Sequence, residues 1–68
     1  MTGEEWISSF AKRIGVERPS QEQIDAILRL AAIAAHASER TSAPLACWMA
    51  GRSGRSLEDL CQLAEALE

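Results

Sequence analysis

The sequence predicts an all-α protein, a compact bundle of four short helices at about residues 3–14, 21–38, 43–52 and 57–67. Two observations predict this fold class. In four separate stretches, apolar residues recur every three or four positions, which is the spacing of one helix face, and each stretch opens with a capping residue. In addition, no stretch alternates apolar and polar residues over the length of a strand, and valine, which favours strands, occurs once.

The first two helices begin with the same sequence signature. Thr2 stands three residues before Glu5, and Ser20 stands three residues before Gln23. This spacing predicts a capping box, in which the two side chains satisfy free backbone N–H groups of the first turn. Gly15 is suited to end the first helix, because glycine readily adopts the left-handed conformation found there. The apolar face of this helix is formed by Trp6, Ile7, Phe10, Ala11 and Ile14.

The second helix is rich in alanine over residues 31–37. Small side chains allow neighbouring helices to approach closely, so we expect this helix to be central and wrapped by the other three. Its large apolar residues do not fit one narrow stripe; they are Ile24, Ile27, Leu28, Leu30 and Ile33. A helix that is apolar on several sides is either enclosed or keeps one face for another chain. A homodimer and a complex with another protein are therefore alternatives to full enclosure.

The third and fourth helices have their own start signals. Ser42 is expected to cap the third helix, and Pro44 fits its first turn, where a missing N–H costs nothing. Gly51 or Gly54 is expected to end it. Leu45, Trp48 and Met49 share one face of this helix. Ser56, three residues before Asp59, predicts the start of the fourth helix, whose buried stripe would be Leu57, Leu60, Cys61, Ala64 and Leu67.

Trp6 and Trp48 are expected in the core, because a domain this small needs its aromatic residues there. An exposed tryptophan would instead indicate an anchor in a protein interface.

Length and composition restrict the classes of function. With 68 residues the chain is one domain, 1–68, and it can bury only about 60% of its unfolded surface. An enzyme pocket of several hundred cubic ångströms is hard to build in such a core. The net charge of -3 argues against binding nucleic acid or an anionic membrane through charge alone. The third helix also lacks the side chains that recognise base edges, which argues against a DNA-binding helix-turn-helix.

Several further features point to a cytoplasmic protein. The longest apolar run, residues 31–35, is far shorter than the ~20 residues of a membrane span, and no secretory signal is evident. Cys47 and Cys61 are too few for a disulfide framework, so we expect reduced thiols.

No catalytic, metal or cofactor site is predicted. The two cysteines lie 14 residues apart in apolar helical patterns without a Cys-x-x-Cys hairpin, and small buried hydrophobes are the simpler interpretation. Ser38, His36 and Glu39 occupy one turn, which cannot place a base and a nucleophile on opposite sides of a substrate.

One segment resembles a known family. Residues 35–51 contain a His (His36), a Glu-Arg pair (Glu39 and Arg40), then Ala-Pro-Leu and an apolar helix that closes on Ala-Gly. This pattern, with an early tryptophan, a Gly-Val break and an alanine-rich second helix, resembles a small actinobacterial domain family of uncharacterised function (DUF6457-like). Members of that family occur alone or as a tail on molybdenum-cofactor guanylyltransferase-like proteins. The resemblance implies a role near molybdopterin chemistry, and it supplies no catalytic residues.

Charge is unevenly distributed in a way that suggests two functions. Residues 36–57 carry three arginines and one acid, a local charge of +2 on an acidic protein. The first hypothesis is a non-catalytic accessory module that docks on a protein partner, such as a molybdenum-cofactor guanylyltransferase, through Arg40, Trp48 and Arg52. The alternative is a small domain that binds a phosphate-bearing ligand, a nucleotide or molybdopterin, with its Gly51–Ser56 loop. There the contacts would be Arg52, Gly54, Arg55 and Ser56, at the start of a helix whose free N–H groups suit an anion.

A structural interpretation stands beside both hypotheses. The simpler interpretation of Gly51–Ser56 is a solvated turn between helices, with glycines that end one helix and Ser56 that starts the next. His36, Glu39, Arg40 and Pro44 are expected to lock the corner between the second and third helices, with Arg40 and His36 complementing the helix dipole.

Overall fold

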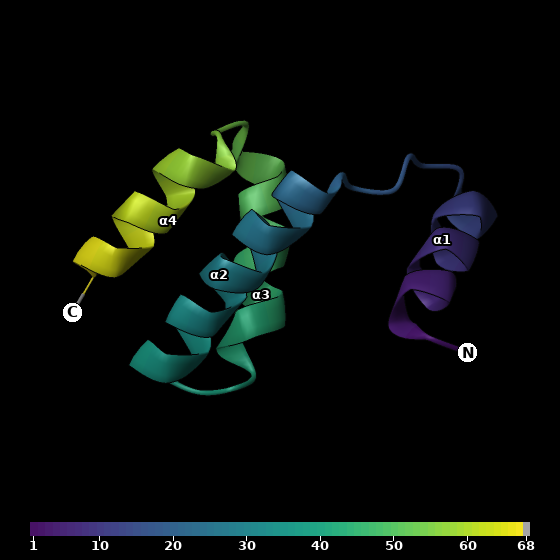
Figure 1. The fold of residues 1–68 in the computed structure, drawn as a ribbon. Coiled ribbons are helices and arrows are strands. Elements are labelled where there is room, and N and C mark those ends of the chain that lie inside the picture. Colours follow the sequence, from purple (N-terminus) through teal and green to yellow (C-terminus); the bar gives the residue numbers. More distant parts are fainter. Residues whose placement is uncertain (68) are drawn as a thin grey trace.

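The computed structural model describes residues 1–67, which form four α-helices and no strand, so the predicted all-α fold class is confirmed (Figure 1). The helices run in the order α1 (Gly3–Ile14), α2 (Gln21–Ala37), α3 (Ser42–Ser53) and α4 (Leu57–Ala66). The predicted bounds agree with these to within one residue at every helix end. In the described part of the chain, none of the helices is both long enough and apolar enough to cross a membrane.

Most of the predicted caps are present. Both capping boxes form: Thr2 Oγ1 accepts from the Glu5 N–H at 3.1 Å, and Ser20 Oγ accepts from the Gln23 N–H at 3.1 Å. Gly15 ends α1 in the left-handed conformation, with φ of 76°. The expected Ser42 cap is wrong, because Ser42 is already the first residue of α3.

The chain turns into α3 through backbone hydrogen bonds instead of a side-chain cap. The Ser42 N–H donates to the carbonyl of Glu39 at 2.9 Å, and the Ala43 N–H donates to the carbonyl of Arg40 at 3.1 Å. The helix ends at Gly54, the second of the two glycines considered, with φ of 75°.

Helix α2 lies at the centre of the packing, as its alanines predict, with α3 and α4 packed along it (Figure 1). Helix α1 differs from the expectation that three helices would wrap α2. It lies to one side, beyond the extended segment 16–20, and makes much less contact. The alanine-rich surface of α2 is therefore covered by two helices.

The core contains few large side chains. Leu30 of α2 is 5% exposed and Cys61 of α4 is 1% exposed, and the Cys61 Sγ lies 3.6 Å from the carbonyl oxygen of Ala26. At the protein surface, an ion pair between Arg29 and Glu65 links α2 and α4. On α3 the half-buried side chains beyond its first residue are all small: Ala43, Ala46, Cys47 and Ala50. Because α2 is the helix packed against α3, this small-residue side faces α2 and lets the two backbones approach closely.

The expectation that both tryptophans lie in the core is wrong. Trp6 is 53% exposed and Trp48 is 64% exposed. Each belongs to a surface cluster on a different helix, Trp6 on α1 and Trp48 on α3. The reason is packing: α3 uses its alanines against α2, and α1 lies away from the α2 surface on which an aromatic residue would be buried.

Candidate functional site

The outer side of α3 carries an apolar surface with a cation on it. Leu45, Trp48, Met49 and Arg52 stand at relative positions 0, 3, 4 and 7, so they share one helix face. We call these four residues the α3 face. Its three apolar members are each more than 60% exposed. The face points away from α2 because the small residues of α3 occupy the opposite side.

Arg52 and Trp48 interact directly. The central guanidinium carbon of Arg52 lies 4.7 Å from the centre of the Trp48 ring, within the range of a cation–π contact. This contact orients a cation and an aromatic ring on the same exposed surface. Tryptophan, methionine and arginine are the residue types enriched in protein interfaces, and tryptophan and arginine are the commonest energetic hot spots.

Arg40, the third predicted contact, lies in the connection before α3. The axis of α3 rises about 9 Å from Ser42 to Trp48, and Arg40 stands two residues before Ser42 in the chain. The structure therefore brings Trp48 and Arg52 together and leaves Arg40 at the opposite end of α3. Contact with all three would require a partner that spans most of this helix.

The corner between α2 and α3 is held by two serines. Ser38 Oγ donates to the carbonyl of Ala34 at 2.7 Å and lies 2.9 Å from Ser42 Oγ. Within residues 1–67, no hydrogen bond or ion pair joins the side chains of His36, Glu39 and Arg40 to one another. Sequence reasoning missed the serine pair, although a serine on each side of a helix break was a usable signal.

Pro44, the fourth member of the predicted corner motif, lies in the first turn of α3 as expected. It supplies no backbone N–H there, at a position where none is required.

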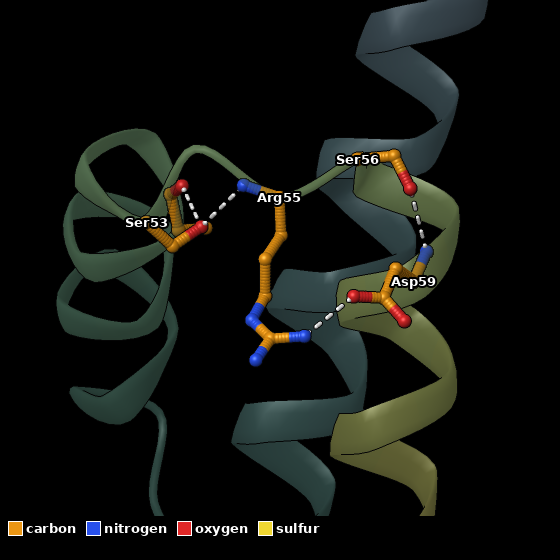
Figure 2. A network of polar contacts seen from close by, with 5 residues as sticks. Ser53, Arg55, Ser56 and Asp59 are labelled. Carbon is orange, nitrogen blue, oxygen red and sulfur yellow. Dashed lines mark hydrogen bonds and ion pairs between the residues drawn. The ribbon is translucent and has the colours of Figure 1, made fainter.

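Of the predicted Gly51–Ser56 loop, residues 51–53 are the end of α3, and residues 54–56 connect it to α4. Apart from Arg52, the polar side chains of this segment are used within it and by α4 (Figure 2). The Arg55 side chain points toward α4, where Nη1 lies 2.9 Å from Asp59 Oδ2. Ser56 Oγ accepts from the Asp59 N–H at 3.1 Å, so the predicted cap of α4 is confirmed. Gly54 provides the left-handed turn that joins the helices.

Ser53 is a further member of this loop network that sequence reasoning missed. Its Oγ donates to the carbonyl of Ala50 at 2.8 Å and accepts from the Arg55 N–H at 3.1 Å (Figure 2). Two of the groups predicted to hold an anion, the Arg55 guanidinium and the Ser56 hydroxyl, are thus already paired. The Asp59 carboxylate beside them would also repel a phosphate. Arg52 points to the α3 face and stacks on Trp48.

Both cysteines are free thiols. Partial burial raises the pKa of the Cys47 thiol, which lowers its reactivity near neutral pH. Among residues 1–67, no group of three or more His, Cys, Asp or Glu side chains could hold a metal ion. Of the sites predicted from the sequence, the α3 face is the one whose residues the structure brings together, with Arg52 over the exposed Trp48 ring.

Comparison with known proteins gives one match over the entire chain. The family model described as "Domain of unknown function (DUF6457)" matches residues 1–68. The chain belongs to the DUF6457 family. No curated protein and no solved structure is similar enough to match it. The description of the family assigns no activity, so function has to be inferred from the surface of this DUF6457 domain.

Proposed function

We propose that this DUF6457 domain is a non-catalytic accessory module that docks on a protein partner through the α3 face. One observation carries the proposal: Trp48 is 64% exposed, and it lies under Arg52 between two exposed apolar neighbours. Burying a large aromatic ring releases more free energy than burying a small side chain. A tryptophan kept in solvent by its own fold is therefore well suited to bind another protein.

The chemistry of the α3 face indicates what the partner surface offers. Leu45, Trp48 and Met49 require an apolar groove that accepts residues three and four positions apart along a helix. Arg52 and Arg40 require acceptors, such as carboxylates, at the two ends of that groove. The local charge of +2 over residues 36–57 would speed encounter with such a surface.

The family resemblance suggests the identity of the partner. Domains of this kind occur as tails on molybdenum-cofactor guanylyltransferase-like proteins, so the proposed partner is a guanylyltransferase of that type. The module would then act in the cytoplasm, in the biosynthesis of the molybdopterin guanine dinucleotide cofactor. It would position or stabilise the enzyme, and it would take no part in bond making.

Titration of the ¹⁵N-labelled domain with the guanylyltransferase from the same organism tests the proposal. The domain has two tryptophans on different helices, so the two indole N–H signals report two surfaces in one spectrum. We expect the Trp48 indole and the amides of α3 to shift, and the Trp6 indole to stay. Trp48→Ala and Arg52→Glu should each weaken binding by about 30-fold or more, as loss of a hot-spot residue does. Trp6→Ala is the matched control and should bind normally.

Two outcomes would contradict this proposal. Unchanged affinity in folded Trp48→Ala and Arg52→Glu variants would exclude the α3 face as the docking site. Shifts of the Arg55 and Ser56 amides with pyrophosphate or a guanine nucleotide, lost in Arg55→Ala, would instead favour the ligand-binding alternative at the Gly51–Ser56 loop.

A further inference from the structure

Helix α1 carries a second exposed apolar surface. Its large residues Trp6, Ile7, Phe10 and Ile14 are each 40% exposed or more. The Trp6 and Phe10 rings stack with their centres 4.9 Å apart and their planes 23° apart. We call these four residues the α1 face. It lies on a different helix from the α3 face (Figure 1).

Contacts within the chain leave the α1 face uncovered. The segment after α1 folds back through the Val16 N–H, which donates to the Ala11 carbonyl at 2.9 Å. Arg18 then reaches the opposite flank of α1, donating to Ser8 Oγ at 2.7 Å and pairing with Glu4 at 3.7 Å. Ser8 stands two residues from Trp6 and from Phe10, which places it across the helix from both rings. These contacts fix the orientation of α1 with its aromatic residues turned outward.

The apolar surface continues beyond α1. A groove of about 340 Å³ runs between α1 and the start of α2, and its wall is almost entirely apolar. Ile7 lines it from α1, and Ile24, Ile27 and Leu28 line it from α2. Ile7 belongs both to the α1 face and to the wall of this groove, so the two are continuous.

The accessible area shows how much surface the chain leaves open. A folded monomer of 7.4 kDa exposes about 4,200 Å². This chain exposes 5621 Å², an excess of roughly 1,400 Å² over that expectation. The radius of gyration, 12.7 Å, likewise exceeds the ~11 Å expected for 68 residues. A stable interface of standard size removes about 800 Å² from each partner, so the excess is sufficient for one.

The direction of pairing follows from the helix dipole. The charged residues of α1 lie outside the α1 face: Glu4 pairs with Arg18, and Lys12 stands two residues from Phe10 and from Ile14, across the helix from both. Antiparallel pairing about a two-fold axis opposes the two helix dipoles, whereas parallel pairing would place like ends together. An isologous contact needs a self-complementary surface, which an apolar face provides.

We propose that the DUF6457 domain forms a homodimer in which the α1 faces of two copies pack antiparallel about a two-fold axis, with the grooves beside them enlarging the interface. The contact leaves both α3 faces free. A dimer would therefore present two docking surfaces, and each would bind a monomeric partner as a single copy does, because avidity requires a partner that engages both at once. The dimer does not depend on the proposed function, because it uses another helix.

Sedimentation equilibrium of the full chain tests the dimer. We expect a concentration-dependent rise from 7.4 kDa to twice that mass, with a dissociation constant of about 10 µM or tighter, as interfaces of this size give. Phe10→Glu should weaken self-association by about 30-fold or more. Trp48→Glu is the matched control, an exposed aromatic residue on the α3 face, and should dimerise normally. Far-ultraviolet circular dichroism checks that both variants stay helical, as their exposure predicts.

Disulfide trapping tests the antiparallel arrangement. Gly3 and Ile14 are the first and last residues of α1 and lie on the same side of it, about three turns apart. A Cβ atom added at Gly3 meets nothing within 4 Å. In a Cys47→Ala background, mixed Gly3→Cys and Ile14→Cys chains should form the mixed disulfide on mild oxidation. Each variant alone should form little disulfide with itself.

Three outcomes would overturn the inference. A chain that sediments as a monomer up to about 0.5 mM would exclude the dimer, since an interface of standard size holds well below that concentration. A dimer that Trp48→Glu disrupts and Phe10→Glu does not would place the contact on α3. Self-linked disulfides in preference to the mixed one would show parallel helices. Because partner binding is measured separately with the Trp48→Ala variant, failure of the dimer leaves the docking proposal intact, and the reverse also holds.

Discussion

In helices α1 and α2, the strength of the local helix signals does not match the extent of burial. Helix α1 has the better local signals, with a capping box, a glycine stop and charges that complement its dipole at both ends. Helix α2 has apolar residues on several sides and a run of alanines, which gives no single obvious buried face. Yet α2 is the centre of the packing and α1 lies at its edge. Strong local signals ensured that α1 is a helix without ensuring that it is buried.

The difference shows how small side chains organise this protein. Alanines on α2 and α3 allow close backbone approach, and that contact needs no large residue. The large residues of α3 are therefore turned outward, as are those of α1. A chain of this size gains its few kcal/mol of stability from a small core, and here most of the large apolar residues of α1 and α3 lie on the surface.

Truncation of a large apolar side chain should give the largest difference in stability between variants of α2 and of α1. Leu30→Ala removes a side chain that is 5% exposed, and we expect a loss of about 2–4 kcal/mol in the free energy of unfolding. Ile14→Ala in α1 removes the same number of carbons from a side chain that is 52% exposed, and it should cost less than about 1 kcal/mol. Urea unfolding at concentrations where the chain is monomeric measures both. Equal losses would mean that α1 belongs to the same cooperative core.

Loss of a cap should have a smaller effect that also differs between the helices. Ser20→Ala removes the cap of α2 and should lower the free energy of global unfolding by about 1 kcal/mol. Thr2→Ala removes the same kind of cap from α1. There we expect fraying of the first turn, seen as faster amide hydrogen exchange, with little change in the global transition. A global loss as large as that of Ser20→Ala would argue against the peripheral position of α1.

Acidification should affect α1 through Glu5 and give the smallest effect. Hydrogen bonds from Thr2, the backbone N–H foremost, lower the pKa of the Glu5 carboxyl below 4.5. Because the folded pKa lies below the unfolded one, the stabilisation is complete above pH 4.5 and is lost as the pH falls through the folded value. An NMR titration of the Thr2 amide should follow this loss. Glu5→Gln keeps a capping acceptor without the charge, so its Thr2 amide should not titrate in this range.

The sequence was sufficient to predict the helices because their boundaries depend on local chemistry. The capping boxes, the left-handed Gly15 and the Ser56 cap each act within about four residues, and all were predicted correctly. The start of α3 was not, since backbone hydrogen bonds from the preceding turn replaced the expected Ser42 cap. At such a position a side-chain oxygen and a backbone carbonyl can each accept the free N–H groups, and the residue pattern does not show which one does.

The candidate site was predictable only in part. Sequence spacing placed Trp48 on one face with Leu45 and Met49, and charge distribution pointed to Arg52. The pairing of Arg55 with Asp59 and the stacking of Arg52 on Trp48 depend on side-chain orientation around the Gly54 turn, which no spacing rule fixes.

Sequence alone thus determined that the chain is helical, where each helix begins and ends to within one residue, and which side chains share a face. Only the tertiary structure decided which face of each helix is buried. Helix α3 has one side of small residues and one side of large residues, and either could have packed against α2. The small side packs there, because it allows the two backbones to approach closely. That choice involves residues far apart in the chain, and it leaves Trp48 on the surface. Trp6 is exposed for another tertiary reason, because α1 lies to one side of α2.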